Sequence, residues 1–505
     1  MLILFAGAVA LELLVHAVSR WRLPRRLLAV LALFAGGCFA TALIALRPNL
    51  FSGLILLLSL YRMFNMVRVV QERMHERYLR NATRTTSFSL LGMQSVVFGG
   101  WLAWDRWHTT GTTTWTVVTG LQLAVAILLL GSVRRNLRKT EWPAAEVADT
   151  HYSDKDLPTV TVAIPARNET EDLQRCLESV IASDYPKLEV IVLDDCSQIK
   201  RTPEIIKQFA HDGVRFIQGK EPSDTWLPKN QAYARLTEEA SGEYTLFCGV
   251  DIRFEPQSIR QLLAVMQQRN KQMLCILPER QLSAYGRSSL IQAMRYWWEL
   301  VPPRRIFRRP PVISSCWVIQ RDALRHAGSF AAVARSIMPE AHFAKSLLAH
   351  DGYSFLRSTD GLNVISTKQF AEQRETAIRM RYPQLHKRPE QVALLTFVEL
   401  VFLLSPFILI VTGFWVSIGA AAHLLAAAAS LLLVITYELS VLSTRVNSWW
   451  FALAGQPLAA LSDLVLLHYS MWKYELSTVE WKGRNVCIPV MHVVPRLPNH
   501  TGELR

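Results

Sequence analysis

Apolar residues gather at the two ends of the chain, in runs that approach the length of a membrane-spanning helix. The first group has runs at about 2–18, 27–46, 50–67, 87–104 and 115–133. A helix that rises 1.5 Å per residue needs about 20 residues to cross the hydrocarbon core of a bilayer. The pattern therefore predicts about five transmembrane helices, which form an N-terminal membrane domain over residues 1–140.

The segments between these runs alternate in charge. Cations are frequent at 19–26, 71–84 and 134–139, and far fewer at 47–51 and 105–114. Because Lys and Arg are retained on the cytosolic side of membranes, this alternation predicts that the N-terminus lies outside. It also predicts that the chain is cytosolic from residue 134 onward.

A second apolar group follows near the C-terminus. Runs at 391–414 and 418–441 predict a transmembrane hairpin over residues 391–442. The next stretch, 449–472, contains Gly455, Pro457 and Asp463, and we interpret it as an interfacial helix. A membrane span is the alternative. The interfacial interpretation leaves the tail within residues 443–505 on the cytosolic side.

The middle of the chain, residues 150–390, has the pattern of a soluble α/β domain. Strands are expected at 159–166, 188–195, 214–219 and 243–251, with helices at about 170–182 and 229–241. Continuous apolar strands alternating with helices predict a parallel sheet that is covered on both faces. Ligands of such sheets bind beyond the carboxyl ends of the strands. Those ends carry polar residues here, at 167–169, 194–195 and 251.

Charge and cysteine usage exclude several classes of function. The net charge is +14, but many cations flank the apolar runs, which favours lipid headgroups as partners over nucleic acid. The basic run at 302–309 suits an interfacial loop in the same way. The seven cysteines are scattered without metal-ligand spacing, so neither zinc nor a disulfide framework is expected.

Four segments of the soluble region resemble the family 2 glycosyltransferases, which have a GT-A fold. They are PARNE (165–169), LDDCS (193–197), WLPKNQA (226–232) and CGVDIRFEP (248–256), and the similarity covers roughly 158–385. The tail TVEWKGRNV (478–486) is similar to the end of bacterial membrane members that act on lipid-linked acceptors. The resemblance implies a Rossmann-like mixed α/β domain in the cytoplasm, inserted between two transmembrane bundles of the inner (plasma) membrane.

The resemblance also assigns residues to the nucleotide-sugar donor. Those expected to bind it are Pro165, Ala166, Arg167, Glu169, Asp194, Asp195, Lys229 and Asp251. The family's DxD motif is Gly249-Val250-Asp251 here, so its first carboxylate is absent. Asp251 is then the expected ligand of Mg²⁺ or Mn²⁺, together with diphosphate oxygens and water.

The catalytic base of the family is an Asp at the start of a helix, in an E-D motif. In this chain Pro339 and Glu340 occupy that place, after Gly328-Ser329-Phe330, so the resemblance implies that Glu340 is the base. A base of this kind removes the proton of the acceptor hydroxyl as the hydroxyl attacks the sugar. A structural role for Glu340 at the helix start is the alternative.

A further set of residues is expected at the diphosphate or the acceptor. It comprises Arg379, Arg381, Tyr382, Trp481, Lys482 and Arg484. The two arginines of 379–382 are equally suited to hold the domain against the membrane. The WKGR segment is expected to close the nucleotide pocket, with Trp481 packing and Lys482 or Arg484 reaching phosphate.

These expectations together predict an inverting transferase that moves a sugar, from a UDP-sugar donor, to a membrane lipid or lipid-linked acceptor at the cytosolic face. Two alternatives stay open. A processive polysaccharide synthase and exporter would need a polar track through the membrane helices. A non-catalytic scaffold with a degenerate transferase domain would account for the departures at Gly249 and Pro339.

Overall fold

The computed structural model of the chain forms two compact units. Unit 1 comprises Met1–Val125 and Leu385–Ser430, and unit 2 comprises Ala126–Gln384 and Leu431–Arg505. The structure describes residues 2–17, 25–46, 50–75, 81–106, 111–143, 154–223, 225–281, 288–303, 310–359, 361–413, 418–446 and 455–487. Most of the basic run at 302–309 lies outside these residues.

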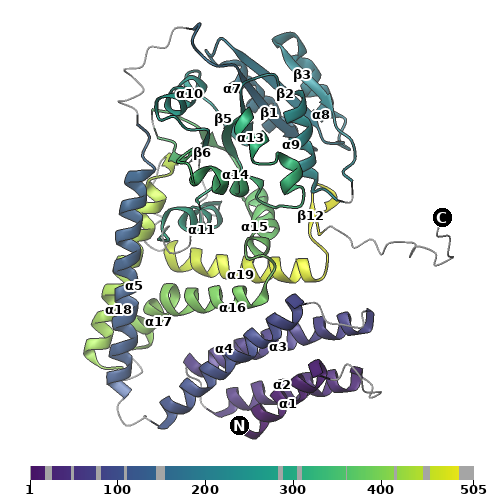
Figure 1. The fold of residues 1–505 in the computed structure, drawn as a ribbon. Helices are drawn as coiled ribbons and strands as arrows, with labels where there is room; N and C mark the ends of the chain where they lie inside the picture. Colours follow the sequence, from purple (N-terminus) through teal and green to yellow (C-terminus); the bar gives the residue numbers. More distant parts are fainter. Residues whose placement is uncertain are drawn as a thin grey trace, which may run out of the picture. The chain divides into compact units, whose positions relative to one another are not determined.

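Unit 1 is helical, and each predicted apolar run of the N-terminal group falls within one helix. These helices are α1 (Leu2–Ala17), α2 (Arg25–Leu46), α3 (Leu50–His75), α4 (Asn81–Arg106) and α5 (Gly111–Lys139), whose second half belongs to unit 2. The first four pack in succession, each against the next (Figure 1). The C-terminal run 391–414 forms α16 (Pro389–Val398), a π-helical turn (Glu399–Leu404) and α17 (Ser405–Thr412). The run 418–441 forms α18 (Ala420–Leu442), whose second half belongs to unit 2.

Four helices of the described chain are long and apolar enough to cross a membrane. They are Phe51–Val69, Gly111–Lys139, Pro389–Thr412 and Ala420–Val441. Both predicted C-terminal spans are in this set, and so are two of the N-terminal runs. Shorter apolar helices cover Ile3–Val15 and Val30–Ala42. The exact number of crossings remains a prediction from the charge alternation.

Polar side chains inside unit 1 pair with one another. Arg62 of α3 contacts Glu12 of α1 and Gln94 of α4, and the amide of Gln94 also donates to Ser59 Oγ at 2.6 Å. Such pairing is expected where little water is available to satisfy polar groups. At the π-helical turn, where the backbone departs from regular i→i−4 bonding, Gln122 of α5 donates to the Val401 carbonyl oxygen at 2.9 Å.

Unit 2 is built on a seven-stranded mixed sheet in the order β3-β2-β1-β4-β8-β6-β9. The predicted strands form its parallel half, as β1 (Val160–Ala166), β2 (Leu188–Asp194), β3 (Val214–Gln218) and β4 (Tyr244–Cys248). Beyond them lie β8 (Cys316–Gln320), β6 (Met273–Leu277) and β9 (Tyr353–Arg357). Strand β8 runs antiparallel to both of its neighbours. The sheet is therefore mixed, as the GT-A resemblance implied.

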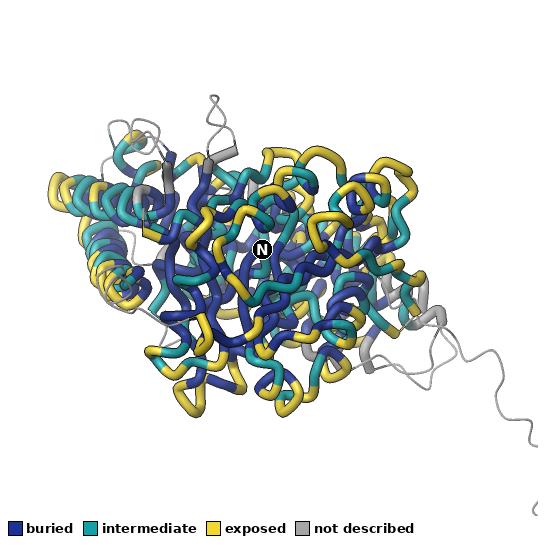
Figure 2. Tube along the Cα trace, turned by 90° about the horizontal axis from the view of Figure 1, so that it is seen from above, coloured by how far each residue is buried: buried dark blue, intermediate teal, exposed yellow. Residues whose placement is uncertain are grey.

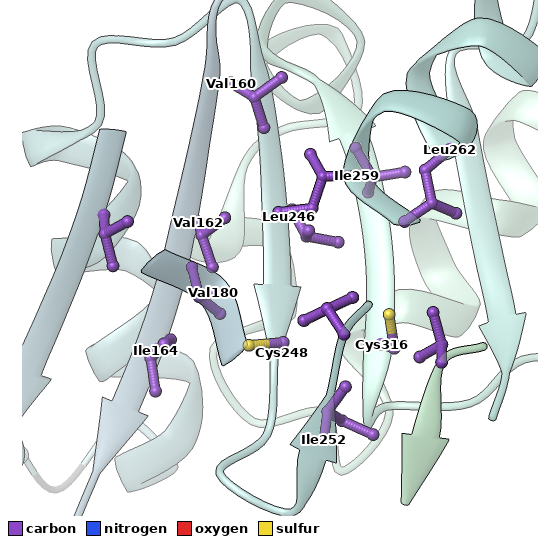
Figure 3. Close-up of a cluster of buried hydrophobic side chains, with 14 of the residues drawn as sticks. Val160, Val162, Ile164, Val180, Leu246, Cys248, Ile252, Ile259, Leu262 and Cys316 are labelled. Carbon is purple, nitrogen blue, oxygen red and sulfur yellow. The ribbon is translucent and has the colours of Figure 1, made fainter. Parts of the chain in front are cut away.

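Helices cover both faces of this sheet. One face packs against α7 (Glu171–Ile181), α8 (Arg201–Gln208) and α10 (Ser258–Gln268). The other packs against α9 (Pro228–Glu239), α11 (Ser288–Leu300), α13 (Arg321–His326) and α14 (Pro339–Leu348). Successive strand residues point to opposite faces, so Val160, Val162 and Ile164 contribute to the first core (Figure 3). Buried residues occupy the interior, while exposed residues lie at turns and on the outer faces of helices (Figure 2).

Unit 2 also contains a second small sheet, a pair of packed helices and a C-terminal hairpin. The short strands β5 (Ile252–Arg253) and β10 (Ile365–Ser366) pair antiparallel, in a second sheet with β7 (Glu279–Gln281) and β11 (Arg445–Val446). Helix α15 (Phe370–Gln384) packs along α19 (Gly455–Glu475). The chain then forms a C-terminal hairpin of β12 (Glu480–Trp481) and β13 (Arg484–Asn485).

Helix α19 corresponds to the stretch that we interpreted as interfacial. One face is held on α15, where Ser470 Oγ donates to the Ile378 carbonyl at 2.5 Å and Tyr474 donates to the Arg379 carbonyl at 2.7 Å. The other face leaves apolar side chains such as Leu461 and Val465 exposed. One packed face and one exposed apolar face suit either an interfacial helix or a membrane span, so the interfacial position of α19 stays a prediction from the sequence.

Candidate active site

The ends of β1 and β2 are held together by Arg167. The Asp195 amide donates to the Ala166 carbonyl at 2.8 Å, which continues the parallel pairing by one residue. The Arg167 guanidinium donates to the carbonyl oxygens of Asp195 at 2.6 Å and Cys196 at 2.7 Å. Pro165 and Ala166 are the last two residues of β1 and lie beside them. Arg167 therefore stabilises the loops that surround the expected nucleoside site.

The two carboxylates at the end of β2 have different partners. Asp194 accepts the Ser197 amide at 3.1 Å and so stabilises the turn after the strand. Asp195 accepts the Arg484 guanidinium at 2.7 Å. Burial raises the pKa of Asp195, and Arg484 acts against that rise. Asp194 therefore has a local partner, whereas Asp195 pairs with Arg484, which lies in a distant segment of the chain.

The C-terminal hairpin lies against these carboxylates. Lys482 forms an ion pair with Glu169, and Arg484 bridges Asp195 and Glu221, the latter at 2.8 Å. Burial raises the pKa of Glu169, and Lys482 opposes that rise. The structure thus brings the WKGR segment to the expected nucleotide site. Its two cations contact carboxylates there, whereas we expected them to reach phosphate.

Asp251 follows β4 and is held by the segment after β10. Ser366 Oγ donates to the Asp251 carboxylate at 2.8 Å, and the Thr367 amide donates to its main-chain oxygen at the same distance. A Cβ placed on Gly249 would lie 2.6 Å from Asp251 Oδ1. The Asp251 carboxylate therefore occupies the space that a first DxD side chain would need in this arrangement.

Glu340 and Lys229 come together because α9 holds the segment that precedes α14. The amide of Asn230 donates to the carbonyl oxygens of Val333 and Ser336, each at 2.7 Å. Pro339 and Glu340 then open α14, where a fixed proline φ and a carboxylate both suit a helix start. Glu340 is fully buried, and its charge favours the protonated form of Lys229.

Several cations gather around Glu340 and Asp251. Burial lowers the pKa of Lys229 to about 8, with Arg379, Lys368 and Arg295 adding to the effect. Burial likewise lowers the pKa of Lys368, and Asp251 opposes this fall. The Lys229 ammonium lies 5.0 Å from the centre of the Tyr233 ring. Together these residues form a cluster of positive side chains that is suited to bind an anion. Its members are Lys229, Lys368, Arg379 and Arg295.

The residues expected from 379–382 separate into two groups. The Arg379 guanidinium stacks on Trp481, 4.8 Å from the ring centre, and so lies at the hairpin. Arg381 instead pairs with Asp463 of α19, and Tyr382 donates to Glu475 at 2.5 Å. Arg379 therefore lies against the hairpin, whereas Arg381 and Tyr382 contact α19.

Sequence reasoning missed Lys368, Arg295 and the role of Asn230. Lys368 follows a two-residue strand that had no signal in the sequence, and Arg295 lies on a helix that was not assigned. Asn230 lies within the WLPKNQA segment, so its role as a buried hydrogen-bond donor could have been predicted from that motif.

The carboxylates present offer limited metal coordination. Among the residues that the structure describes, no group of three or more His, Cys, Asp or Glu side chains could hold a metal ion. Asp251 alone fits the manner in which Mg²⁺ is often bound, through one or two carboxylates plus substrate phosphates and water.

The mixed sheet, covered by helices on both faces, has the α/β architecture of a GT-A domain. Residues 161–328, about a third of the chain, match the family model described as Glycosyl transferase family 2.

Similarity to individual proteins is confined to part of the chain. Glycosyltransferase AglE of Haloferax volcanii is 36% identical over 99 residues, which are 19% of this chain and 31% of that protein. TuaG of Bacillus subtilis, a glycosyltransferase named for teichuronic acid biosynthesis, is 26% identical over 22% of this chain and 44% of its own. The chain thus spans less than half the length of either relative. A mannosyltransferase from Pyrobaculum calidifontis, solved with GDP-Man and Mn²⁺, is 17% identical, covers 68% of this chain and 99% of its own, and has a TM-score of 0.40.

We expect Asn230→Ala to destabilise the protein, because it leaves buried carbonyl oxygens before α14 without their donor. The loss should be about 1–3 kcal/mol, seen as a lower melting temperature of the full-length protein in detergent. Asn230→Asp should be similarly destabilised, since it lacks the donor. Gln257→Ala, which removes an exposed amide, is the control and should melt like the wild type. An unchanged melting temperature for both Asn230 variants would contradict this role.

Proposed function

We propose that the protein is an inverting glycosyltransferase that moves a sugar from a nucleotide-sugar donor, a UDP-sugar, to a membrane lipid or lipid-linked acceptor. Its family 2 domain supports the transfer chemistry. The four helices suited to a bilayer support an acceptor in the membrane. The charge alternation of the N-terminal segments favours the cytosolic face of the inner membrane for the reaction.

The observation that carries the proposal is the meeting of Glu340 and Asp251 with a cluster of cations at one edge of the sheet. The charge of Glu340 raises the pKa of Lys229 and that of Lys368 lowers it, while Asp251 raises the pKa of Lys368. Inverting transfer needs a base for the acceptor and positive charge for the departing diphosphate. Both requirements are present within this group of residues.

In the proposed mechanism Glu340 accepts the proton of the acceptor hydroxyl. The hydroxyl oxygen attacks the anomeric carbon as the bond from that carbon to the diphosphate oxygen breaks. The electron pair of that bond leaves with the nucleoside diphosphate. Lys229, Lys368 and Arg379 stabilise the negative charge that collects on it. Burial of Glu340 keeps water away from the base.

The donor's nucleoside is assigned to the ends of β1 and β2. Glu169 and Asp195 provide acceptors for hydroxyl or imide protons, and the main chain at Pro165 and Ala166 borders them. A divalent cation, Mg²⁺ or Mn²⁺, would be held by Asp251 and would add positive charge at the diphosphate. The domain limits proposed are 1–140, 150–390, 391–442 and 443–505.

Transfer can be tested with purified full-length protein in lipid vesicles and radiolabelled UDP-glucose, UDP-GlcNAc or GDP-mannose. We expect label to enter the organic extract as a single-sugar lipid with a UDP-sugar. High-molecular-weight product would favour a processive synthase instead. If the folded protein neither binds a nucleotide nor transfers label, the scaffold interpretation replaces this proposal.

Glu340→Gln should lower turnover about 10²–10⁴-fold, because a positioned base contributes that much to proton transfer. The amide is close in size to the carboxylate and cannot accept the proton. UDP affinity, measured by calorimetry, should change little, which separates a catalytic role from a folding defect. Glu178→Gln, an exposed change on α7, is the matched control. Turnover near the wild-type value in Glu340→Gln would exclude Glu340 as the base.

UDP affinity should fall as the pH rises from 7 to 9. The pKa of Lys229 is lowered to about 8, so its positive charge is present below that pH and lost above it. We expect the dissociation constant to increase up to about tenfold over this range. Lys229→Arg keeps the charge and should remove most of the dependence. Uridine, which has no diphosphate, serves as the control ligand, and an equal fall for uridine would contradict the assignment.

Mn²⁺ should strengthen UDP binding by the wild type more than by Asp251→Asn. An amide is a weaker ligand for a hard cation than a carboxylate, so the variant should lose most of the increment. Calorimetry with Mn²⁺ and with EDTA measures this difference directly. Asp322→Asn, an exposed change on α13, is the control for removal of a carboxylate elsewhere. An undiminished Mn²⁺ effect in Asp251→Asn would show that other groups bind the metal.

A further inference from the structure

The WKGR segment forms a tight turn whose shape is set by its glycine. Trp481 pairs with Arg484 across the C-terminal hairpin, so Lys482 and Gly483 are the two central residues of the turn. Both have positive φ, 47° for Lys482 and 78° for Gly483. Two-residue hairpin turns with positive φ at both positions match the twist of their strands, and glycine adopts this conformation without strain. The turn presents Lys482 and Arg484 to the same edge of the sheet.

The carboxylates beneath the turn are occupied by these cations. Arg484 and Asp195 leave only 10% and 7% of their side chains exposed, so the pair is almost closed to solvent. Lys482 covers Glu169 in the same way, and its carbonyl oxygen accepts Arg167 Nε at 3.1 Å. The hairpin therefore holds both carboxylates that the proposed function assigns to the nucleoside.

The carboxylates of Asp195 and Glu169 cannot bind the hairpin cations and a nucleoside fully at the same time. A nucleoside that donates hydrogen bonds to Asp195 and Glu169 needs their carboxylate oxygens. Those oxygens now accept hydrogen bonds from Arg484 and Lys482. We propose that the C-terminal hairpin is an autoinhibitory element, which a donor nucleotide must displace from Asp195 and Glu169 before it binds. Phosphate groups of the donor then offer the released cations new partners, so UDP can compensate for the displacement and uridine cannot.

This inference rests on the proposed function, and uridine binding tests it apart from transfer. Arg484→Ala and Lys482→Ala should each bind uridine more tightly than the wild type, by about tenfold in the double variant, or about 1.4 kcal/mol. Glu221→Gln loosens Arg484 without altering either nucleoside carboxylate, and it should give a smaller gain in the same direction. Calorimetry or microscale thermophoresis on the full-length protein gives these constants.

Arg235→Ala is the matched control, since it removes an arginine from an exposed ion pair on α9. It should leave uridine binding unchanged. If Arg484→Ala and Lys482→Ala bind uridine as the wild type does, or more weakly, the hairpin is not inhibitory and the proposed transferase function stands. If neither uridine nor UDP binds to any folded variant, the proposed donor site and the inhibition both fail.

A second measurement needs no variant and so survives any folding defect. The Val479 amide donates to Cys487 Sγ at 3.3 Å, which makes this thiol part of the hairpin. Saturating UDP should increase the rate of Cys487 alkylation several-fold, as followed by peptide mass spectrometry. Cys176, which is fully buried in the core, serves as the internal reference. An unchanged or slower rate at Cys487 would overturn the displacement.

Discussion

Burial of carboxylates at the carboxyl edge of the sheet is the constraint on which the rest of unit 2 depends. Glu169 and Asp195 lie where β1 and β2 end, and burial raises the pKa of both. A buried carboxylate is costly unless a cation or donor is close to it. The chain provides Lys482 and Arg484, which are 313 and 289 residues away from these partners. The distant C-terminal segment is therefore needed to complete the edge of the sheet.

The parallel half of the sheet was predictable because each of its strands is rich in apolar and β-branched residues. Strands β6, β8 and β9 were not predicted, since each has only five residues, of which five, four and three are apolar, and so short a run resembles a piece of buried helix as much as a strand. The reversed direction of β8 depends on its neighbours and has no local signal. The predicted strand 243–251 ends early, at Cys248, because the chain turns there toward Asp251. Short-range pattern thus defined the elements, and tertiary contacts decided their pairing.

The sequence motifs identified the carboxylates near the strand ends more completely than the cations that surround them. Glu169, Asp195 and Asp251 stand at strand ends, where position alone indicates a ligand. Lys368 follows the short strand β10, and its place beside Asp251 depends on pairing with β5. At Gly249 an added Cβ would lie 2.6 Å from Asp251 Oδ1, so a side chain there would require the Asp251 carboxylate to rotate away from its present position. Loss of the first DxD carboxylate is therefore compatible with an ordered site and does not by itself indicate degeneration.

Helix α15 connects this site with α19 through residues on its two sides. Arg379 and Arg381 are two positions apart, about 200° around a helix, so they point in nearly opposite directions. Arg379 stacks on Trp481 of the hairpin, whereas Arg381 pairs with Asp463 of α19. The hairpin follows α19 directly in the chain, so both of its attachments depend on how α19 packs on α15. The packing of α19 on α15 thereby positions the segment that covers Glu169 and Asp195.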